Sequence, residues 1–138
     1  MKKLLLTSAL ALPLCADALA QPTVIGPGNA IICNKIANLA AGPVVMTQVI
    51  APVTGQIVAF CGWHVTNTGT TGTFSFSYGT GSNCGTGTNT FLTAQNVSSN
   101  APSADHSGYA SFNAPASNAI CVTPSVATIA TTVFYAQF

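Results

Sequence analysis

Gln56-Ile-Val-Ala-Phe-Cys-Gly-Trp-His-Val-Thr66 and Thr73-Phe-Ser-Phe-Ser-Tyr-Gly79 are the two stretches that decide the fold. In the second stretch Phe74, Phe76 and Tyr78 alternate with Thr and Ser, which is the period of a strand with one buried face. In the first stretch the same alternation predicts an apolar face made of Ile57, Ala59, Cys61, Trp63 and Val65. We therefore predict two neighbouring strands, separated by a turn at residues 67–72, that build an aromatic core around Trp63.

The rest of the chain has a similar pattern, with short apolar stretches separated by Gly, Pro and Asn. No window after residue 20 shows the 3.6-residue periodicity of a helix. We expect strands at residues 31–36, 44–50, 56–66, 73–79, 90–94, 109–112, 119–123 and 127–138, with a polar loop at 96–105. About eight short strands predict an all-β fold, an antiparallel β-sandwich of jelly-roll type rather than a seven-stranded immunoglobulin domain.

The N-terminus has the pattern of a bacterial secretory signal peptide. Lys2 and Lys3 precede an apolar run at residues 4–14, and Ala18-Leu-Ala20 is a small-x-small cleavage site. Cys15 leaves lipid attachment as an alternative, although that motif prefers a small residue where Leu14 stands. We expect residues 1–20 to be removed, 21–30 to form an extended arm and 31–138 to form one domain, in a secreted protein without a membrane span.

Four cysteines remain after the predicted cleavage: Cys33, Cys61, Cys84 and Cys121. An even number in an oxidising compartment predicts two disulfides, for which three pairings exist. We favour Cys33–Cys61, which joins neighbouring strands, and Cys84–Cys121, which ties a glycine-rich loop to a later strand. A zinc site is disfavoured because no Cys-x-x-Cys spacing occurs.

Charge is nearly absent from the predicted mature chain, where Lys35 and Asp105 are the only formally charged side chains. Phosphate contacts to nucleic acid and a basic face for anionic lipid both require cationic clusters, so we expect neither partner. Paired carboxylates for glycoside hydrolysis are excluded because Asp105 is the only carboxylate side chain of the predicted mature chain.

Catalytic groups are equally scarce, since His64, Asp105 and His106 are the whole supply of imidazole and carboxylate side chains in the predicted mature chain. A triad could be drawn from them and a serine, but no Gly-x-Ser-x-Gly motif occurs. A copper site made of His64, His106 and Met46 would need scattered residues to meet, and Met46 has the pattern of a core residue. We expect a non-enzymatic protein with no catalytic residues, no metal and no cofactor.

The low charge favours association between copies. Exposed sheet edges are normally protected by lysines or inward charges, and near-zero net charge promotes assembly. We expect a structural subunit that forms a homo-oligomer or polymer: an extracellular filament, a surface layer or a virion appendage. The expected interface residues are Val24 and Ile25 of the arm and Phe134, Tyr135 and Phe138 of the last strand.

The alternative is a β-sandwich that binds glycans or cell surfaces, an expectation by analogy of fold. Its candidate contacts are Tyr109, Asn83, Asn89 and Asn100.

Four segments of the chain also carry a resemblance to known proteins. They are Phe60-Cys-Gly-Trp63, Tyr78-Gly-Thr-Gly-Ser-Asn-Cys-Gly-Thr-Gly-Thr88, Asn118-Ala-Ile-Cys-Val122 and Phe134-Tyr-Ala-Gln-Phe138. Together they resemble a set of small bacterial and phage-encoded secreted β domains. The resemblance implies a compact, cysteine-containing β domain in a secreted or virion-associated setting, and it implies no catalytic residues.

Overall fold

The computed structural model describes residues 30–42, 44–106, 108 and 110–138, so the predicted signal peptide and most of the predicted arm lie outside the described residues. The described part is all-β, with nine strands and one short 3-10 turn, η2 (Ser82–Cys84). The strands are β1 (Lys35–Leu39), β2 (Thr47–Ile50), β3 (Val58–Asn67), β4 (Gly72–Thr80), β5 (Thr86–Val97), β6 (Pro102–His106), β7 (Phe112–Ala114), β8 (Ala119–Pro124) and β9 (Ile129–Gln137). Among these residues no helix has the length and apolar character needed to cross a membrane.

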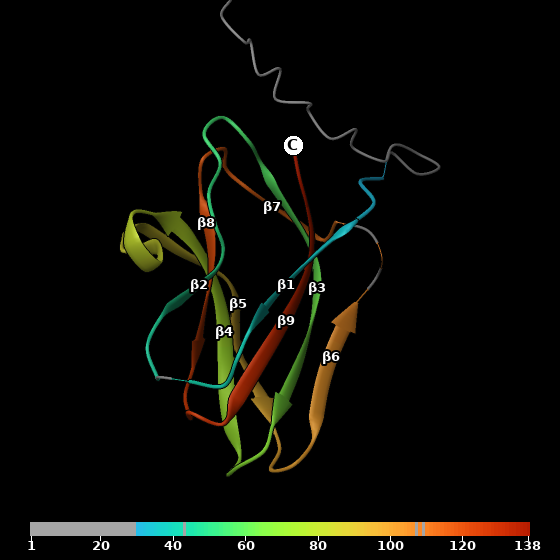
Figure 1. Cartoon of the computed structure of the whole chain (residues 1–138), viewed down its shortest axis with the longest axis vertical. Helices are drawn as coiled ribbons and strands as arrows, with labels where there is room; N and C mark the ends of the chain where they lie inside the picture. Colours follow the sequence, from blue (N-terminus) through green and yellow to red (C-terminus); the bar gives the residue numbers. More distant parts are fainter. Residues whose placement is uncertain (1–29, 43, 107, 109) are drawn as a thin grey trace, which may run out of the picture.

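Two antiparallel sheets face each other and confirm the predicted sandwich (Figure 1). One has the strand order β1-β9-β3-β6, with β7 also on β3, and the other has the order β2-β8-β4-β5. The strands pair as in one long folded hairpin, first with last, second with eighth, third with sixth and fourth with fifth, which is a jelly-roll arrangement. Both β6 and β7 pair with β3, at residues 62–66 and 58–60, so they occupy a single edge position as one interrupted strand. Eight strand positions result, as predicted.

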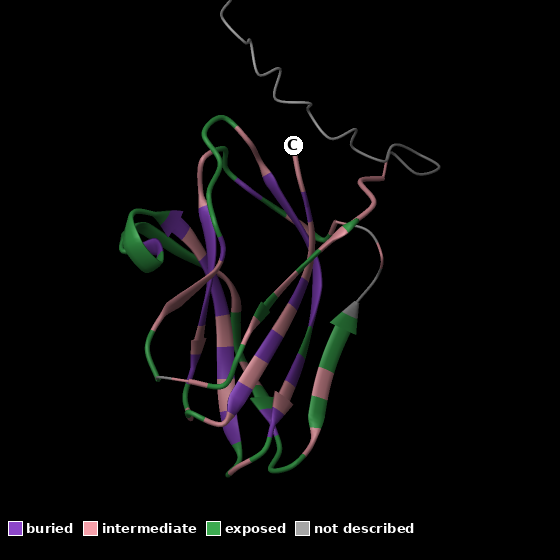
Figure 2. Ribbon diagram, in the orientation of Figure 1, coloured by how far each residue is buried: buried purple, intermediate pink, exposed green. Residues whose placement is uncertain are grey.

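The core is an aromatic cluster between the sheets. Phe76 is fully buried at its centre, with its ring centroid 5.1 Å from that of Phe60 and 6.1 Å from that of Trp63. Phe91 of β5 stacks on Phe112 of β7 at 4.1 Å, which joins the two sheets along one flank. Figure 2 shows buried residues concentrated on β3, β4, β8 and β9 and exposed ones on β6. The predicted inward positions Phe74, Phe76 and Tyr78 are confirmed, since all three belong to the cluster or pack against it.

The predicted inner face of β3 is wrong in its first half. Val58 and Phe60 face the core together with Trp63 and Val65, because the register against β9 shifts between Phe60 and Gly62. This shift is a β-bulge, and Gly62 accepts its backbone φ of 144°. The other side of the strand is also buried here, since Cys61 is bonded to Cys33, whose sulfur lies 3.6 Å from the carbonyl oxygen of Ala59. Because both faces of this part of β3 are apolar, the sequence pattern does not show where the register shifts.

Several boundaries also differ from the predictions, including those of the predicted strands 44–50 and 109–112, which are β2 at 47–50 and β7 at 112–114. The expected polar loop at 96–105 is wrong, because residues 102–106 form β6 along the edge of β3. This strand is largely exposed, so it lacks the apolar alternation that marks a half-buried strand. For the same reason β5 was predicted too short, since most of its twelve residues are exposed. The first strand lies at 35–39 instead of 31–36.

Candidate functional site

Two disulfides brace the sandwich, and they are the pairing that the sequence favoured. Cys33–Cys61 ties the segment before β1 to β3, with the two Cα atoms 6.1 Å apart. Cys84–Cys121 ties η2 to β8 across 6.2 Å. Disulfides of this kind are typical of proteins in oxidising compartments.

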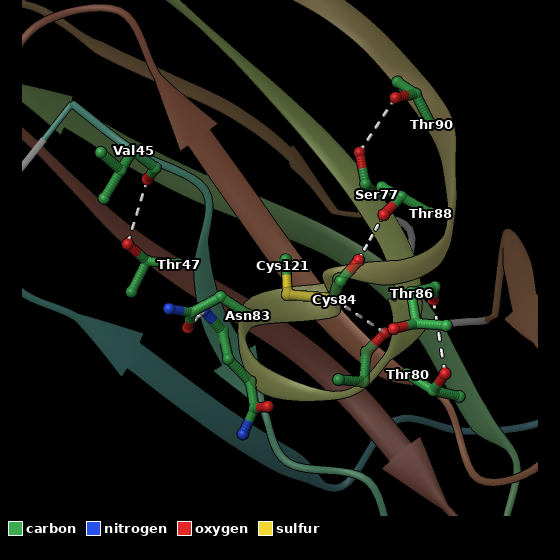
Figure 3. Close-up of a disulfide and its surroundings, with 12 residues drawn as sticks. Val45, Thr47, Ser77, Thr80, Asn83, Cys84, Thr86, Thr88, Thr90 and Cys121 are labelled. Carbon is green, nitrogen blue, oxygen red and sulfur yellow. Dashed lines mark hydrogen bonds between the residues drawn. A yellow bond between two sulfur atoms is a disulfide. The ribbon is translucent and has the colours of Figure 1, made fainter.

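The glycine-rich loop between β4 and β5 is held closely around the second disulfide (Figure 3). Cys84 is fully buried and has a positive φ of 56°, and its carbonyl oxygen accepts a hydrogen bond from the Thr88 hydroxyl. The side-chain oxygen of Asn83 accepts a hydrogen bond from the backbone N–H of Gln48 in β2, at 3.0 Å. A Cβ on Gly79 would lie 2.8 Å from the Cys84 carbonyl oxygen, so the loop packs directly on the bare backbone of β4. These contacts make the loop a structural connection between strands.

Three of the residues available for a triad or a metal site, His64, Asp105 and Met46, are not brought together, and the backbone of the fourth, His106, pairs with Gly62 at the end of β6. His64 lies opposite Ala104 and Asp105 lies opposite Trp63, so His64 and Asp105 occupy positions on opposite faces of the sheet. Met46 packs against Cys84 and its neighbours in the other sheet. Among the described residues no group of three His, Cys, Asp or Glu side chains is placed to hold a metal ion.

The predicted assembly residues do not form one surface. Phe134 lies on the solvent side of β9 opposite Ile36, whereas Tyr135 packs against the core, and burial raises the pKa of its hydroxyl. Phe138 is half-buried, and its backbone pairs with that of Ile57 at the end of the sheet. Val24 and Ile25 lie outside the described residues, as does Tyr109 among the glycan candidates.

The outer face of the β1-β9-β3-β6 sheet is broad and carries no formal charge. We use "outer face" for the positions that strand register places on its solvent side: Ile36, Asn38, His64, Thr66, Pro102, Ala104, Ala130, Thr132 and Phe134. Ile36 is the most exposed large apolar side chain of the described chain, at 61 %. Beside it Thr132 donates a 2.8 Å hydrogen bond to Asn38.

The two charged residues of the described chain both lie on edge strands of this same sheet. Lys35 lies on the same face of β1 as Ala37 and Leu39, which pack against the core. Asp105 on β6 is paired with the buried Trp63 of β3 and so lies on the core side of the sheet. Each charge therefore occupies a core-facing position of an edge strand, a known protection against edge-to-edge pairing.

The edges of the other sheet are protected without charge. Strand β2 has only four residues. The long β5 carries three register shifts against β4, each placing an extra residue on β5, and such bulges disrupt a regular edge. The sheet edges of this protein are therefore poorly suited to strand addition, and its faces remain available.

We expect the double variant Lys35→Val/Asp105→Val to form thioflavin-positive aggregates that the wild-type protein does not form. The two substitutions remove the inward edge charges, while the unfolding free energy should change by no more than about 1 kcal/mol, because Asp105 is exposed and Lys35 is only half-buried. Asn38→Val is the matched control, because it adds the same side chain to β1 on the outer face. Equal thioflavin signals from the control and the double variant would contradict the proposed edge protection.

A concavity lies at one end of the outer face. An open pocket of about 400 Å³ is formed by the end of β3, the turn that follows it and the loop between β5 and β6. It contains His64 and Asn100, one of the four glycan candidates, whereas Asn83 and Asn89 belong to the distant η2 region. A second cavity between the sheets, lined by Leu39, Val122 and Ile129, has a volume of only about 20 Å³. That space is sufficient for a single water.

Comparison with known proteins finds no matching family model, no similar curated protein and no similar solved structure. The resemblance to small secreted bacterial and phage-encoded domains therefore stays a prediction. The fold and its surfaces define the protein as a disulfide-braced jelly-roll sandwich with an uncharged outer face.

Proposed function

We propose that this protein is an exported structural subunit that assembles with copies of itself through the outer face of the β1-β9-β3-β6 sheet. The observation that carries the proposal is the placement of charge. The only lysine and the only aspartate of the described chain protect edge strands, and the broad face between them has none.

An uncharged face associates without the large desolvation penalty that buried ions impose. Its threonine and asparagine side chains can exchange hydrogen bonds with a neighbour, and Ile36 supplies apolar area that burial would stabilise. The protected edges direct such association to the face, so copies stack as folded units instead of joining into a continuous sheet.

Export and the final form of the assembly belong to the same proposal. The signal-peptide pattern and the two disulfides support an extracellular location. The predicted arm at 21–30 would add a second, apolar contact between neighbours through Val24 and Ile25. Jelly rolls occur in capsid and lectin domains, so the fold is compatible with a filament, a surface layer or a virion appendage without selecting one.

Ile36→Asp should raise the dissociation constant for self-association roughly 10- to 100-fold, because it removes an exposed isoleucine that association would bury and introduces a charge at the contact. Sedimentation velocity over a concentration series, with negative-stain electron microscopy, measures the change on the secreted protein. Val53→Asp is the control, since Val53 is similarly exposed, at 43 %, but lies in the β2–β3 loop away from the outer face. A wild-type protein that stays monomeric at all concentrations would overturn the proposal, as would equal effects of both variants.

A further inference from the structure

The open pocket has the features of a ligand site, and it lies at the end of the outer face that His64, Thr66 and Pro102 form. Its volume of about 400 Å³ falls in the range of small-molecule sites, roughly 300–1,000 Å³. The side chains of His64, Thr66 and Thr68 line it and make no hydrogen bond within the part of the chain that the structure describes. The side-chain carbonyl of Asn100 likewise has no partner among the described residues, while its amide nitrogen binds Ser99.

The base of the pocket is rigid because a single buried residue holds the segments around it. Asn67 is 2 % exposed, and its amide nitrogen donates to the carbonyl oxygen of Thr70 at 2.7 Å and, more weakly, to those of Val97 and Ser98. Its side-chain oxygen accepts from the Gly69 backbone N–H and from the Thr128 hydroxyl. Asn67 thereby fixes the turn after β3, the end of β5 and the turn before β9 relative to one another. A site fixed before binding loses less entropy when a ligand arrives.

The chemistry of the lining selects the ligand class. No formally charged side chain lines the pocket, so an ionic ligand would lose hydration without a counter-charge. Two hydroxyls, an imidazole and an amide carbonyl offer both donors and acceptors, which matches a ligand whose own groups are hydroxyls. Ala101 and Pro102 add carbon surface against which the C–H side of a sugar ring can pack.

We propose that the pocket formed by His64, Thr66, Thr68 and Asn100 binds an uncharged sugar residue. This inference stands independently of self-assembly, since the pocket is complete within one copy of the chain.

Saturation-transfer difference NMR tests the inference, because it observes the ligand. The titration is run on the wild-type protein and on Ile36→Asp, in which weaker self-association leaves the outer face uncovered. The probes are the methyl glycosides of glucose, galactose, mannose and N-acetylglucosamine, with the methyl glycoside of sialic acid as the charged comparator. We expect saturable transfer to at least one neutral probe with a dissociation constant of about 1 mM, and none to the charged one. Repeating the titration with neutral tetrasaccharides separates a free sugar from a chain end, since tighter binding of the longer ligand identifies a glycan chain as the source.

The variants His64→Ala and Asn100→Gly should each weaken binding at least tenfold. Asn100 has a positive φ of 54°, so glycine removes its amide without straining the backbone. Asn89→Ala is the matched control, because Asn89 is also an exposed asparagine but lies on β5 near the η2 turn. Thermal melting verifies that each variant is folded. The inference is overturned if no neutral probe shows transfer, if the charged probe binds better, or if the control weakens binding as much as the two pocket variants.

Discussion

Replacing both Cys84 and Cys121 with alanine is expected to reduce the free energy of unfolding by about 4 kcal/mol. The disulfide closes a loop with a sequence separation of 37 residues, and opening it returns conformational freedom to the unfolded chain. Since domains of this size are stable by roughly 5–15 kcal/mol, the loss is a large part of the total.

Packing adds to this loss. Both sulfurs are fully buried in a small cluster with Ala119, and Met46 packs against it. The bond also holds the η2 turn, in which Asn83 and Cys84 have positive φ values, on the bare backbone of Gly79. Without the bond, we expect this turn and the adjoining end of β5 to separate from β8.

Urea unfolding measures the effect, with the fluorescence of Trp63, the single tryptophan, as the signal. The matched control is Cys33→Ala/Cys61→Ala, which opens a similar separation of 28 residues, although Cys33 is only half-buried. Loop closure alone predicts nearly equal losses, so any excess for the Cys84–Cys121 variant measures the packing contribution. A loss below about 1 kcal/mol at Cys84–Cys121 would show that this disulfide does not stabilise the folded chain.

Asn67→Ala should destabilise the fold by about 3 kcal/mol and abolish sugar binding at the pocket. The substitution removes a buried amide that makes five hydrogen bonds, and it leaves the Val97 carbonyl oxygen and the Gly69 N–H without those partners. Unpaired buried groups of this kind each cost about 1–3 kcal/mol, which water entering from the pocket would partly offset.

The same two measurements, urea unfolding and saturation transfer, test this expectation. Asn38→Ala is the matched control, because Asn38 is exposed on the outer face and its side chain accepts a single hydrogen bond, from Thr132. We expect that variant to lose no more than about 0.5 kcal/mol and to retain the pocket. If Asn67→Ala is no less stable than Asn38→Ala, Asn67 does not hold the three segments together.

The sequence pattern was sufficient to predict the class of fold and the two disulfides. Alternation at residues 74–78 identified a half-buried strand, and turn residues at regular intervals indicated a jelly-roll sandwich. The four cysteines suggested two disulfides, with the favoured pairing present in the structure. These features depend on residues close together in the chain, or on a few groups that have only a few ways to pair.

Pairing between distant segments decided the remaining features. The bulge at Gly62, the edge strand β6 and the core-facing positions of Lys35 and Asp105 all follow from strand register. Asn67 has the sequence pattern of an ordinary turn residue, yet it joins segments that lie 30 and 61 residues further along the chain. The pocket likewise combines His64 of β3 with Asn100 of the loop between β5 and β6. Side-chain periodicity describes only which face of its own strand a residue occupies. The edge strands, the contacts of Asn67 and the pocket all depend on how separate strands align, which periodicity does not describe.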